Sequence, residues 1–308
     1  MKKILLICGR ERGLFIIKEL TNNNVNISGV IIMKDDPHEI PWSEKIGELS
    51  KSKNIPYEIG KSFNNDNILN FYKELEPHIV FTENWRTMIP RSIYEKAKHF
   101  VVFHESLLPK YRGFAPLSWP IINGESETGV TMFYIGEDVD AGPIIDRYKI
   151  PIKHDDSCNE LYLKTFDAYL NLCLKNIPRL INDDVQTKLQ NENDATFACM
   201  RTPDDGWIDW SKSAKQIHNF IRALKPPLLP GAFTFYNGNK IVIISAEISV
   251  IKDKYVGKIP GRIIKIDDDS VYVLCGDGII KIKEAKLENS DSVEKASKIF
   301  NKMKIKIG

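Results

Sequence analysis

Residues 3–8 read Lys-Ile-Leu-Leu-Ile-Cys, an almost continuous apolar run that ends directly before Gly9. Such a run is typical of a β-strand that helices cover on both faces. Over the first 150 residues, similar strand-like runs alternate with helix-like segments. The strand-like runs are 27–33, 78–82 and 100–104, and the helix-like segments are 14–20, 42–51, 68–75 and 93–97. This alternation predicts βα units, and therefore an α/β domain with a doubly wound, Rossmann-like, mostly parallel sheet.

The pattern changes near residue 200. Residues 226–231 (PPLLPG) mark a loop, and short strand-like runs follow it. These runs are 232–236, 240–245, 261–266, 270–274 and 278–283. Asn237-Gly238 and Asp277-Gly278 separate two pairs of them and predict hairpins. We therefore expect a small β-barrel, OB-like in type, or a sandwich, with a closing helix over 292–303. The expected two domains comprise residues 1–200 and 201–308.

Composition excludes several classes of function. The 308 residues include 43 basic and 41 acidic side chains, a formal net charge of +2, which argues against a large nucleic-acid footprint. The apolar part of the N-terminus is too short for a secretion signal, and no run is long enough to span a membrane. The five cysteines form no C-x-x-C pair. We expect a cytoplasmic protein with no membrane partner and no metal site.

The loop after the first strand reads Gly9-Arg-Glu-Arg-Gly13, which departs from the G-x-G-x-x-G fingerprint of dinucleotide-binding domains. NAD is therefore not expected. Open α/β sheets nevertheless bind ligands at the carboxyl ends of their strands. Arg10 is thus a candidate for contacting an anionic group of a substrate, and a solvated loop is the alternative interpretation.

Two residues between 100 and 145 are candidates for acid–base chemistry. His104 ends an apolar strand, and Asp140 follows the strand-like run 129–135 in a loop. If these two strands are neighbours, the Asp140 carboxylate accepts a hydrogen bond from the imidazole and fixes its tautomer. Taken singly, a histidine satisfied by a backbone carbonyl and a turn aspartate are the alternative interpretations.

Three blocks in this region resemble the signature of the 10-formyltetrahydrofolate-dependent formyltransferases. They are H-x-S-L-L-P-x-Y-R-G-x-x-P from His104, G-E-x-E-T-G-V-T from Gly124 and D-x-D-A-G-x-I from Asp138. The likeness continues through 81–90 (FTENWRTMIP), 201–210 (RTPDDGWIDW) and 221–235. The T-P-D-D and P-G-A-F blocks are most similar to nucleotide-sugar N-formyltransferases, notably the formyltransferase half of the bifunctional enzyme that acts on UDP-4-amino-4-deoxy-L-arabinose.

The resemblance implies a reaction and its participants. His104 and Asp140 match two members of the family's Asn-x-His and Asp catalytic group. The donor would be 10-formyltetrahydrofolate and the acceptor the amine of a nucleotide-linked amino sugar, as used in making lipopolysaccharide or surface polysaccharide. The family asparagine corresponds to Val102, which offers no hydrogen-bond donor. Three explanations account for this departure. Asn84 or a backbone N–H could supply the missing donor, a protonated His104 could stabilise the oxyanion itself, or the protein could catalyse a slow or different reaction.

Other site residues follow from the resemblance by position. The predicted folate contacts are Thr87, Met88, Ile89, Phe114, Gly136, Glu137, Asp138 and Val139. The predicted substrate contacts are Arg10, Arg112, Trp85 and Tyr111. Arg112 is equally well interpreted as a structural clamp, and the aromatic residues as packing.

Two further functions stay open. The first is methionyl-tRNA formyltransferase, which requires a basic loop after the second strand. Here residues 33–48 contain Asp35, Asp36, Glu39 and Glu44, an acidic set that would repel phosphate. The second is a folate- or nucleotide-binding relative with weak or lost catalysis, which Val102 suggests. A homodimer is expected from base rates alone.

Overall fold

The computed structural model describes residues 2–37, 39–251 and 253–308. Within them the chain forms two compact units. The first contains the residues up to Gly113 together with Thr128–Ile150 and Leu163–Phe197. The second contains Phe114–Glu127, Pro151–Tyr162 and Ala198–Gly308. The assignment of separate functions to residues 1–200 and 201–308 stays a prediction.

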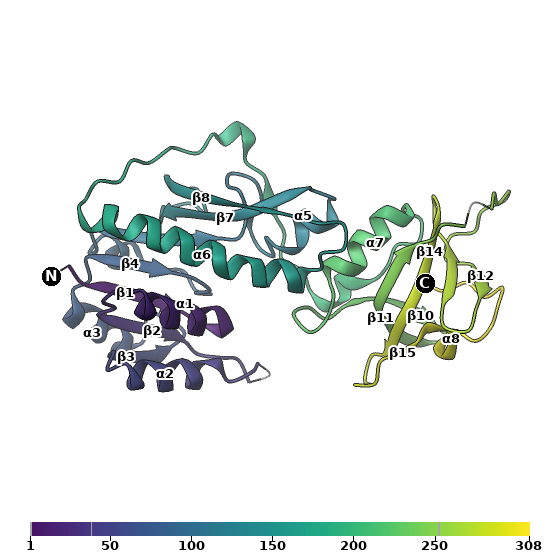
Figure 1. Cartoon of the computed structure of the whole chain (residues 1–308), viewed down its shortest axis with the longest axis horizontal. Helices are drawn as coiled ribbons and strands as arrows, with labels where there is room; N and C mark the ends of the chain where they lie inside the picture. Colours follow the sequence, from purple (N-terminus) through teal and green to yellow (C-terminus); the bar gives the residue numbers. More distant parts are fainter. Residues whose placement is uncertain (1, 38, 252) are drawn as a thin grey trace. The chain divides into compact units, whose positions relative to one another are not determined.

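A seven-stranded sheet forms the centre of the first unit (Figure 1). Its strands are β1 (Ile4–Cys8), β2 (Gly29–Met33), β3 (Tyr57–Gly60), β4 (Ile79–Thr82), β5 (His99–His104), β7 (Glu127–Tyr134) and β8 (Ile144–Pro151). They are ordered β3-β2-β1-β4-β5-β7-β8. The first five are parallel, and β7 pairs antiparallel to β5. The predicted Rossmann-like, mostly parallel sheet is confirmed.

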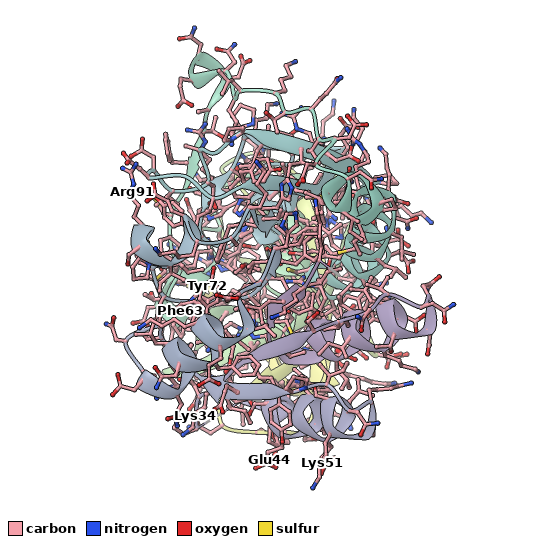
Figure 2. The ribbon with its side chains drawn as sticks, turned by 90° about the vertical axis from the view of Figure 1, so that its left-hand side faces the viewer. Lys34, Glu44, Lys51, Phe63, Tyr72 and Arg91 are labelled. Atoms are coloured by element: carbon pink, nitrogen blue, oxygen red, sulfur yellow. The ribbon has the colours of Figure 1, made fainter. Side chains whose placement is uncertain are left out.

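Helices cover both faces of this sheet. On one face lie α1 (Arg10–Asn22), α2 (Trp42–Ser52) and α6 (Cys158–Ile181), and on the other lie α3 (Asp66–Leu75) and α4 (Arg91–Tyr94). Phe103 of β5 stacks on Tyr169 of α6 at 4.7 Å between ring centroids. On the other face, Phe63 and Tyr72, both labelled in Figure 2, meet edge to face at 5.5 Å. Each face of the sheet is therefore closed by aromatic packing, as the continuous apolar strands require.

Local sequence signals explain where helices begin. The Asn65 side chain accepts hydrogen bonds from the backbone N–H groups of Asn67 and Ile68 and caps α3. Before α1 stands Gly9, and Gly13 lies against β1: a Cβ at Gly13 would stand 3.2 Å from the Cβ of Cys8. Glycine at position 13 therefore permits the close approach of α1 to the first strand.

The second unit is built on a six-stranded antiparallel sheet. Its strands are β10 (Ala232–Tyr236), β11 (Asn239–Ile248), β12 (Ile263–Ile266), β13 (Val271–Leu274), β14 (Ile279–Leu287) and β15 (Glu294–Lys295). The Asn237-Gly238 turn between β10 and β11 has φ angles of 50° and 78°, the left-handed conformation of the predicted hairpin. The expected closing helix over 292–303 is wrong in extent: α8 covers only Ala296–Ile299.

The remaining elements of the chain are short, apart from the helix α7. They are β6 (Arg112–Gly113), α5 (Ser118–Ile122), η1 (Glu192–Asp194), β9 (Phe197–Ala198), η2 (Pro203–Gly206) and α7 (Ala214–Ala223). Ser213 caps α7 in a reciprocal arrangement with Gln216. Across the described stretches 2–37, 39–251 and 253–308, no helix combines the length and apolar character that a membrane span needs.

Candidate active site

His104 and Asp140 meet at the carboxyl end of β5. The Nδ1 atom of His104 lies 3.5 Å from Oδ2 of Asp140, and both side chains are largely buried. This separation permits an ion pair and is longer than an ordinary N–H···O hydrogen bond. On the other side of the ring, Nε2 lies 2.6 Å from the carbonyl oxygen of Tyr111. A carbonyl only accepts, so Nε2 carries a proton and donates it there.

The positions of both acceptors are fixed by the backbone around them. Asp140 has a φ of 53° and Tyr111 a φ of 60°, both in the left-handed region. The Asp140 carboxylate accepts a hydrogen bond of 2.8 Å from the N–H of Gly113. The Gln190 side chain donates to the Asp140 carbonyl oxygen at 2.7 Å. With a carboxylate at Nδ1 and a carbonyl at Nε2, the imidazolium is the form of His104 that donates on both sides.

An unpartnered hydroxyl lies beside this pair. Thr82, the last residue of β4, is 3% exposed, and its Oγ1 has no hydrogen-bond partner among the described residues. Thr82 pairs in register with Val102 of β5. Because side chains alternate along a strand and Val80 and Phe100 share one core cluster, Thr82, Val102 and His104 lie on the same face of the sheet. Val102 is half-buried although β5 is an internal strand.

Asn84 is placed differently. Its Nδ2 is buried without a partner among the described residues, and it lies 3.1 Å from where a Cβ on Gly9 would stand. The same position is 2.9 Å from the Cβ of Met33 at the end of β2. In the sheet, β1 and β2 are on the opposite side of β4 from β5. Asn84 therefore points away from the His104 strand and does not take the place of a donor at position 102.

Comparison with known proteins agrees with this arrangement. The formyl transferase family matches residues 2–177, and the formyl transferase C-terminal domain family matches residues 201–304. The chain belongs to the formyl transferase family. The two-part fold predicted from the sequence is consistent with these two matches.

Three solved structures illustrate the likeness. HypX from Aquifex aeolicus superimposes with a TM-score of 0.65 at 16% identity over 98% of this chain, which spans only 49% of HypX. The N-formyltransferase from Helicobacter canadensis, in complex with folinic acid and dTDP-3-aminofucose, gives 0.66 at 24% identity over 92% of this chain and 99% of its own. Methionyl-tRNA formyltransferase from Clostridium thermocellum gives 0.58 at 19% identity over 90% and 100%. At these identities the likeness shows the fold.

Arg112 holds two side chains of the segment near Asp140, those of Gln190 and Glu192. Its side chain is buried, and its two terminal nitrogens donate to the Glu192 carboxylate at 2.7 and 2.8 Å. It also donates to the Gln190 side chain at 2.9 Å. Because Gln190 in turn donates to the Asp140 carbonyl oxygen, Arg112 helps to hold Asp140 in place. The structure favours the structural interpretation of Arg112 over a ligand contact.

A second buried charge cluster, which the sequence analysis missed, lies at the ends of β1, β4 and β5. The Arg12 guanidinium donates to Glu83 at 3.0 Å and to Glu105 at 2.5 Å. Arg12 also donates to the hydroxyl of Thr165 at 3.1 Å and lies 4.2 Å from the ring centroid of Tyr169. Burial raises the pKa of Glu83 despite the nearby Arg12. Burial also acts to raise the pKa of Glu105, but the charges of Arg12 and His104 outweigh it and hold that pKa below its usual range.

The two segments predicted to contact folate are tied together. Arg91, directly after the loop that carries Thr87, Met88 and Ile89, forms an ion pair with Glu137. Glu137 belongs to the loop Gly136–Val139, so this ion pair brings the two loops side by side. Within the first loop, Met88 is 75% exposed and Ile89 is buried in the core. The Thr87 hydroxyl donates to the Lys61 carbonyl. Met88 thus presents its side chain to solvent in this loop, whereas Ile89 is turned into the core.

The predicted substrate residues divide between surface and core. Arg10 donates a hydrogen bond of 2.7 Å to the Glu39 carboxylate, and Arg86 donates two more, of 2.7 and 2.9 Å, to the same carboxylate. Burial acts to raise the pKa of Glu39, but hydrogen bonds from Arg86, the Asp36 backbone and Arg10 lower it to about 2. Trp85 packs against Phe63 at 5.6 Å between ring centroids, and its indole N–H finds no partner among the described residues.

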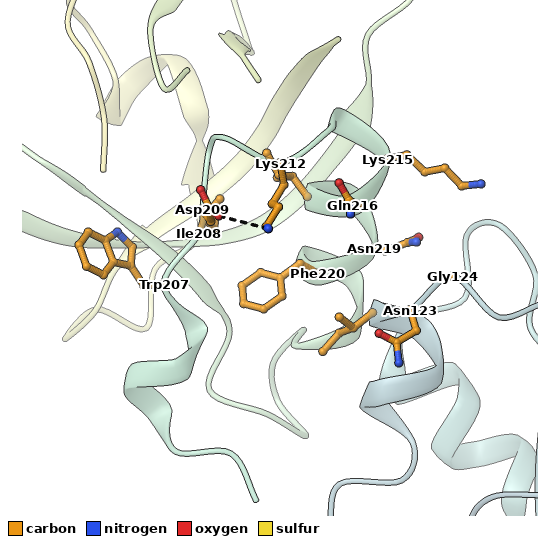
Figure 3. A pocket seen from close by; sticks show the side chains of 12 residues that line it. Asn123, Gly124, Trp207, Ile208, Asp209, Lys212, Lys215, Gln216, Asn219 and Phe220 are labelled. Atoms are coloured by element: carbon orange, nitrogen blue, oxygen red, sulfur yellow. Dashed lines mark ion pairs between the residues drawn. The ribbon is translucent and has the colours of Figure 1, made fainter. Parts of the chain in front are cut away.

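Phe114 and a pocket of the structure belong to the second unit. Phe114 is 58% exposed there, so the structure leaves its predicted folate contact as a prediction. A pocket of about 500 Å³ lies between α5 and α7, with Phe220 and Trp207 in its wall (Figure 3). Lys212 at its rim pairs with Asp209 at 3.8 Å. None of the site residues predicted from the sequence lines this pocket.

Proposed function

We propose that this formyltransferase moves the formyl group of 10-formyltetrahydrofolate to the amine of a nucleotide-linked amino deoxysugar. The observation that supports it most directly is the approach of His104 to Asp140, at the edge of a parallel sheet where α/β folds bind their ligands. A formylfolate, when bound, supplies the activated carbonyl. The paired loops that carry Met88 and Glu137 offer it backbone groups, and Thr82 offers a buried donor.

Proton transfer is assigned to His104. The attacking amine must lose a proton and the leaving nitrogen must gain one, and a well-placed imidazole contributes about 10²–10⁴ in rate to such steps. The Asp140 carboxylate beside Nδ1 stabilises the imidazolium and fixes the direction of the ring. In the present structure Nε2 donates to the Tyr111 carbonyl. Substrate must therefore replace that carbonyl before the imidazolium gives its Nε2 proton to the leaving nitrogen. The neutral ring then takes up the proton that the attacking amine loses, which restores the imidazolium.

The negative charge that develops on the formyl oxygen needs a donor aimed at it. We assign this role to the Thr82 hydroxyl together with the His104 imidazolium. Thr82 lies next to Val102 on the His104 face of the sheet, and its hydroxyl is buried without a partner among the described residues. The preformed orientation of such a donor lowers the barrier because no water must reorganise during the reaction.

An amino-sugar acceptor fits the acidic loop after β2 better than tRNA does. The loop after β2 places Asp36 and Glu39 in ion pairs with Arg86 and Arg10. These pairs cancel the positive charge that a phosphate backbone would need at this edge. We expect the protein to act in the cytoplasm, without a metal ion in the reaction.

The test is turnover with defined acceptors. The purified chain, 10-formyltetrahydrofolate and a panel of nucleotide-linked 3-amino and 4-amino sugars should release tetrahydrofolate with at least one acceptor. His104→Gln and Asp140→Asn should lower kcat about 10²–10⁴-fold. The matched control is His154→Gln, which alters a histidine of the second unit.

Two results would overturn the proposal. Formylation of initiator methionyl-tRNA with no sugar turnover would assign the chain to the tRNA-dependent class. Measurable binding of the donor with no transfer to any acceptor would mark a binding relative whose catalysis has been lost.

A further inference from the structure

A separate cluster of titratable side chains lies at the amino ends of β4 and β5, whereas His104 stands at the carboxyl end of β5. His78 directly precedes β4, and His99 is the first residue of β5, so both stand at the amino ends of parallel strands. Asp183 follows the end of α6. One ligand atom from each of these three residues lies within 4.8 Å of the other two. Nothing in the proposed reaction uses this cluster.

The atoms that meet are the ones that bind metals. Nε2 of His99 lies 2.8 Å and Nε2 of His78 lies 3.1 Å from the same oxygen, Oδ1 of Asp183. The other oxygen, Oδ2, is held by the ammonium of Lys2 at 2.5 Å. Two imidazole nitrogens therefore converge on one carboxylate oxygen, while the second oxygen is turned to a different partner.

The backbone holds the two imidazoles in this arrangement. The N–H of His99 donates to the carbonyl of His78 at 3.0 Å, and the N–H of His78 donates to Lys3 at 2.9 Å. His99 is thus part of the sheet, and His78, directly before β4, is held to the sheet by these two backbone hydrogen bonds. Sites built on strands hold ligand geometry more accurately than sites on loops.

We propose that His78, His99 and Asp183 bind one divalent transition-metal ion of the Zn²⁺ type. Two imidazole nitrogens and one carboxylate oxygen suit Zn²⁺, whereas Mg²⁺ and Ca²⁺ prefer oxygen ligands alone. The side chains of His78 and Asp183 are 24% and 40% exposed. That exposure provides an entry path and leaves a fourth position to water.

Tyr134 supplies the outer partner that metal-binding histidines usually have. Its hydroxyl lies 2.6 Å from Nδ1 of His99. A hydroxyl both donates and accepts, so the Tyr134 oxygen can accept a hydrogen bond from Nδ1–H of His99 when the lone pair of Nε2 faces the ion.

Bound metal would connect the starts of β4 and β5 to the end of α6. Its role would be structural, because His104 stands at the opposite end of β5. The inference does not depend on the proposed acceptor.

The test uses the full chain freed of metal with a chelator and titrated with Zn²⁺ against a chromophoric chelator. We expect one Zn²⁺ per chain, and with Co²⁺ the visible absorption of a four-coordinate site. Tyr134→Phe should weaken Zn²⁺ binding about 10–100-fold, and His78→Ala or Asp183→Asn should weaken it further. Lys2→Ala should tighten binding, because it removes the cation that competes for Asp183.

The matched control is His154→Ala. His154 stacks on His218 in the second unit, at 5.3 Å between ring centroids, outside the cluster. Its variant should bind Zn²⁺ like the unaltered chain. Absence of stoichiometric binding by the unaltered chain would overturn the proposal. So would Zn²⁺ affinity that persists in a His78→Ala/Asp183→Asn double variant whose circular dichroism shows a folded chain, since other ligands would then hold the ion.

Discussion

The buried hydroxyl of Thr82 lowers the free energy of unfolding. A buried hydroxyl without a partner costs about 1–3 kcal/mol relative to one that is satisfied, and Thr82 Oγ1 finds none among the described residues. Valine has the same shape and no such cost. A hydroxyl at this position, beside Val102 and on the face of His104, is therefore best explained by a ligand atom that it contacts.

Thr82→Val should separate function from stability. We expect kcat for formyl transfer to fall about 10²–10³-fold, while the free energy of unfolding stays unchanged or rises, because an unsatisfied hydroxyl is removed. Thr82→Ser keeps the donor and should retain most of the activity. Steady-state kinetics and urea unfolding of both variants check this.

Val102→Asn in the Thr82→Val background offers an independent check. The amide would place a donor on the neighbouring strand of the same face and should recover part of the lost kcat. If the unaltered enzyme is active and the Thr82→Val variant is equally active, Thr82 has no part in the mechanism. The proposed reaction would stand unchanged.

His104 and Asp140 were within reach of sequence reasoning, and Thr82 was not. His104 ends an apolar run, Asp140 stands in the loop after another, and both fall within the blocks that resemble the formyltransferase signature. A threonine in a strand is ordinary, and only the register with Val102 gives it significance. Arg112 illustrates the same limit: its partner Glu192 lies 80 residues away, so no local pattern distinguishes a clamp from a ligand contact.

At the scale of elements, the Arg12 cluster joins α1 to the ends of β4 and β5. Arg12 stands in the first turn of α1, and its carboxylate partners are Glu83 and Glu105. The sequence predicts a loop over residues 9–13, but residues 10–13 form the first turn of α1. The burial of Arg12 left no sign in the sequence, because its partners are 71 and 93 residues distant along the chain. A buried ion pair costs solvation, so its main effect is to specify how these elements dock.

The two carboxylates of this cluster should respond differently to neutralisation. The pKa of Glu83 is raised by burial, whereas that of Glu105 is held low by Arg12 against burial. Glu105→Gln therefore removes the charge that compensates Arg12 and should destabilise the fold by about 3–5 kcal/mol. Glu83→Gln should cost clearly less at neutral pH. Urea unfolding at pH 7 measures both, and a larger loss for Glu83→Gln would contradict the assignment.

At the scale of the whole molecule, the sequence predicted both sheets but not the grouping of the segments between them. Hairpin turns and apolar runs are local, so the strands themselves and the β10–β11 and β13–β14 hairpins could be predicted. The pairing of β11 with β14 could not. Residues Phe114–Glu127 and Pro151–Tyr162 join the C-terminal unit through tertiary contacts. Asn159, for example, donates to the Pro226 carbonyl at 2.8 Å. Such contacts leave no periodicity in the sequence.

Acid stability is a property of the whole chain that one histidine of α7 should influence. Burial, with smaller contributions from Arg222 and His154, lowers the pKa of His218 from 6.5 to about 4. The folded state thus keeps His218 neutral, while the unfolded chain takes up a proton below pH 6.5. The stabilisation is complete above pH 6.5 and is lost as the pH falls towards 4.

Because His218 is partly solvated, its share of this loss should be about 1 kcal/mol after screening. Urea unfolding at pH 7 and pH 5, followed by the fluorescence of tryptophans that include the buried Trp210, measures the difference. His218→Gln cannot titrate and should reduce the loss of stability between these two pH values. If the variant and the unaltered chain lose the same stability on acidification, proton uptake elsewhere governs the acid response, and the buried ring of His218 has no part in it.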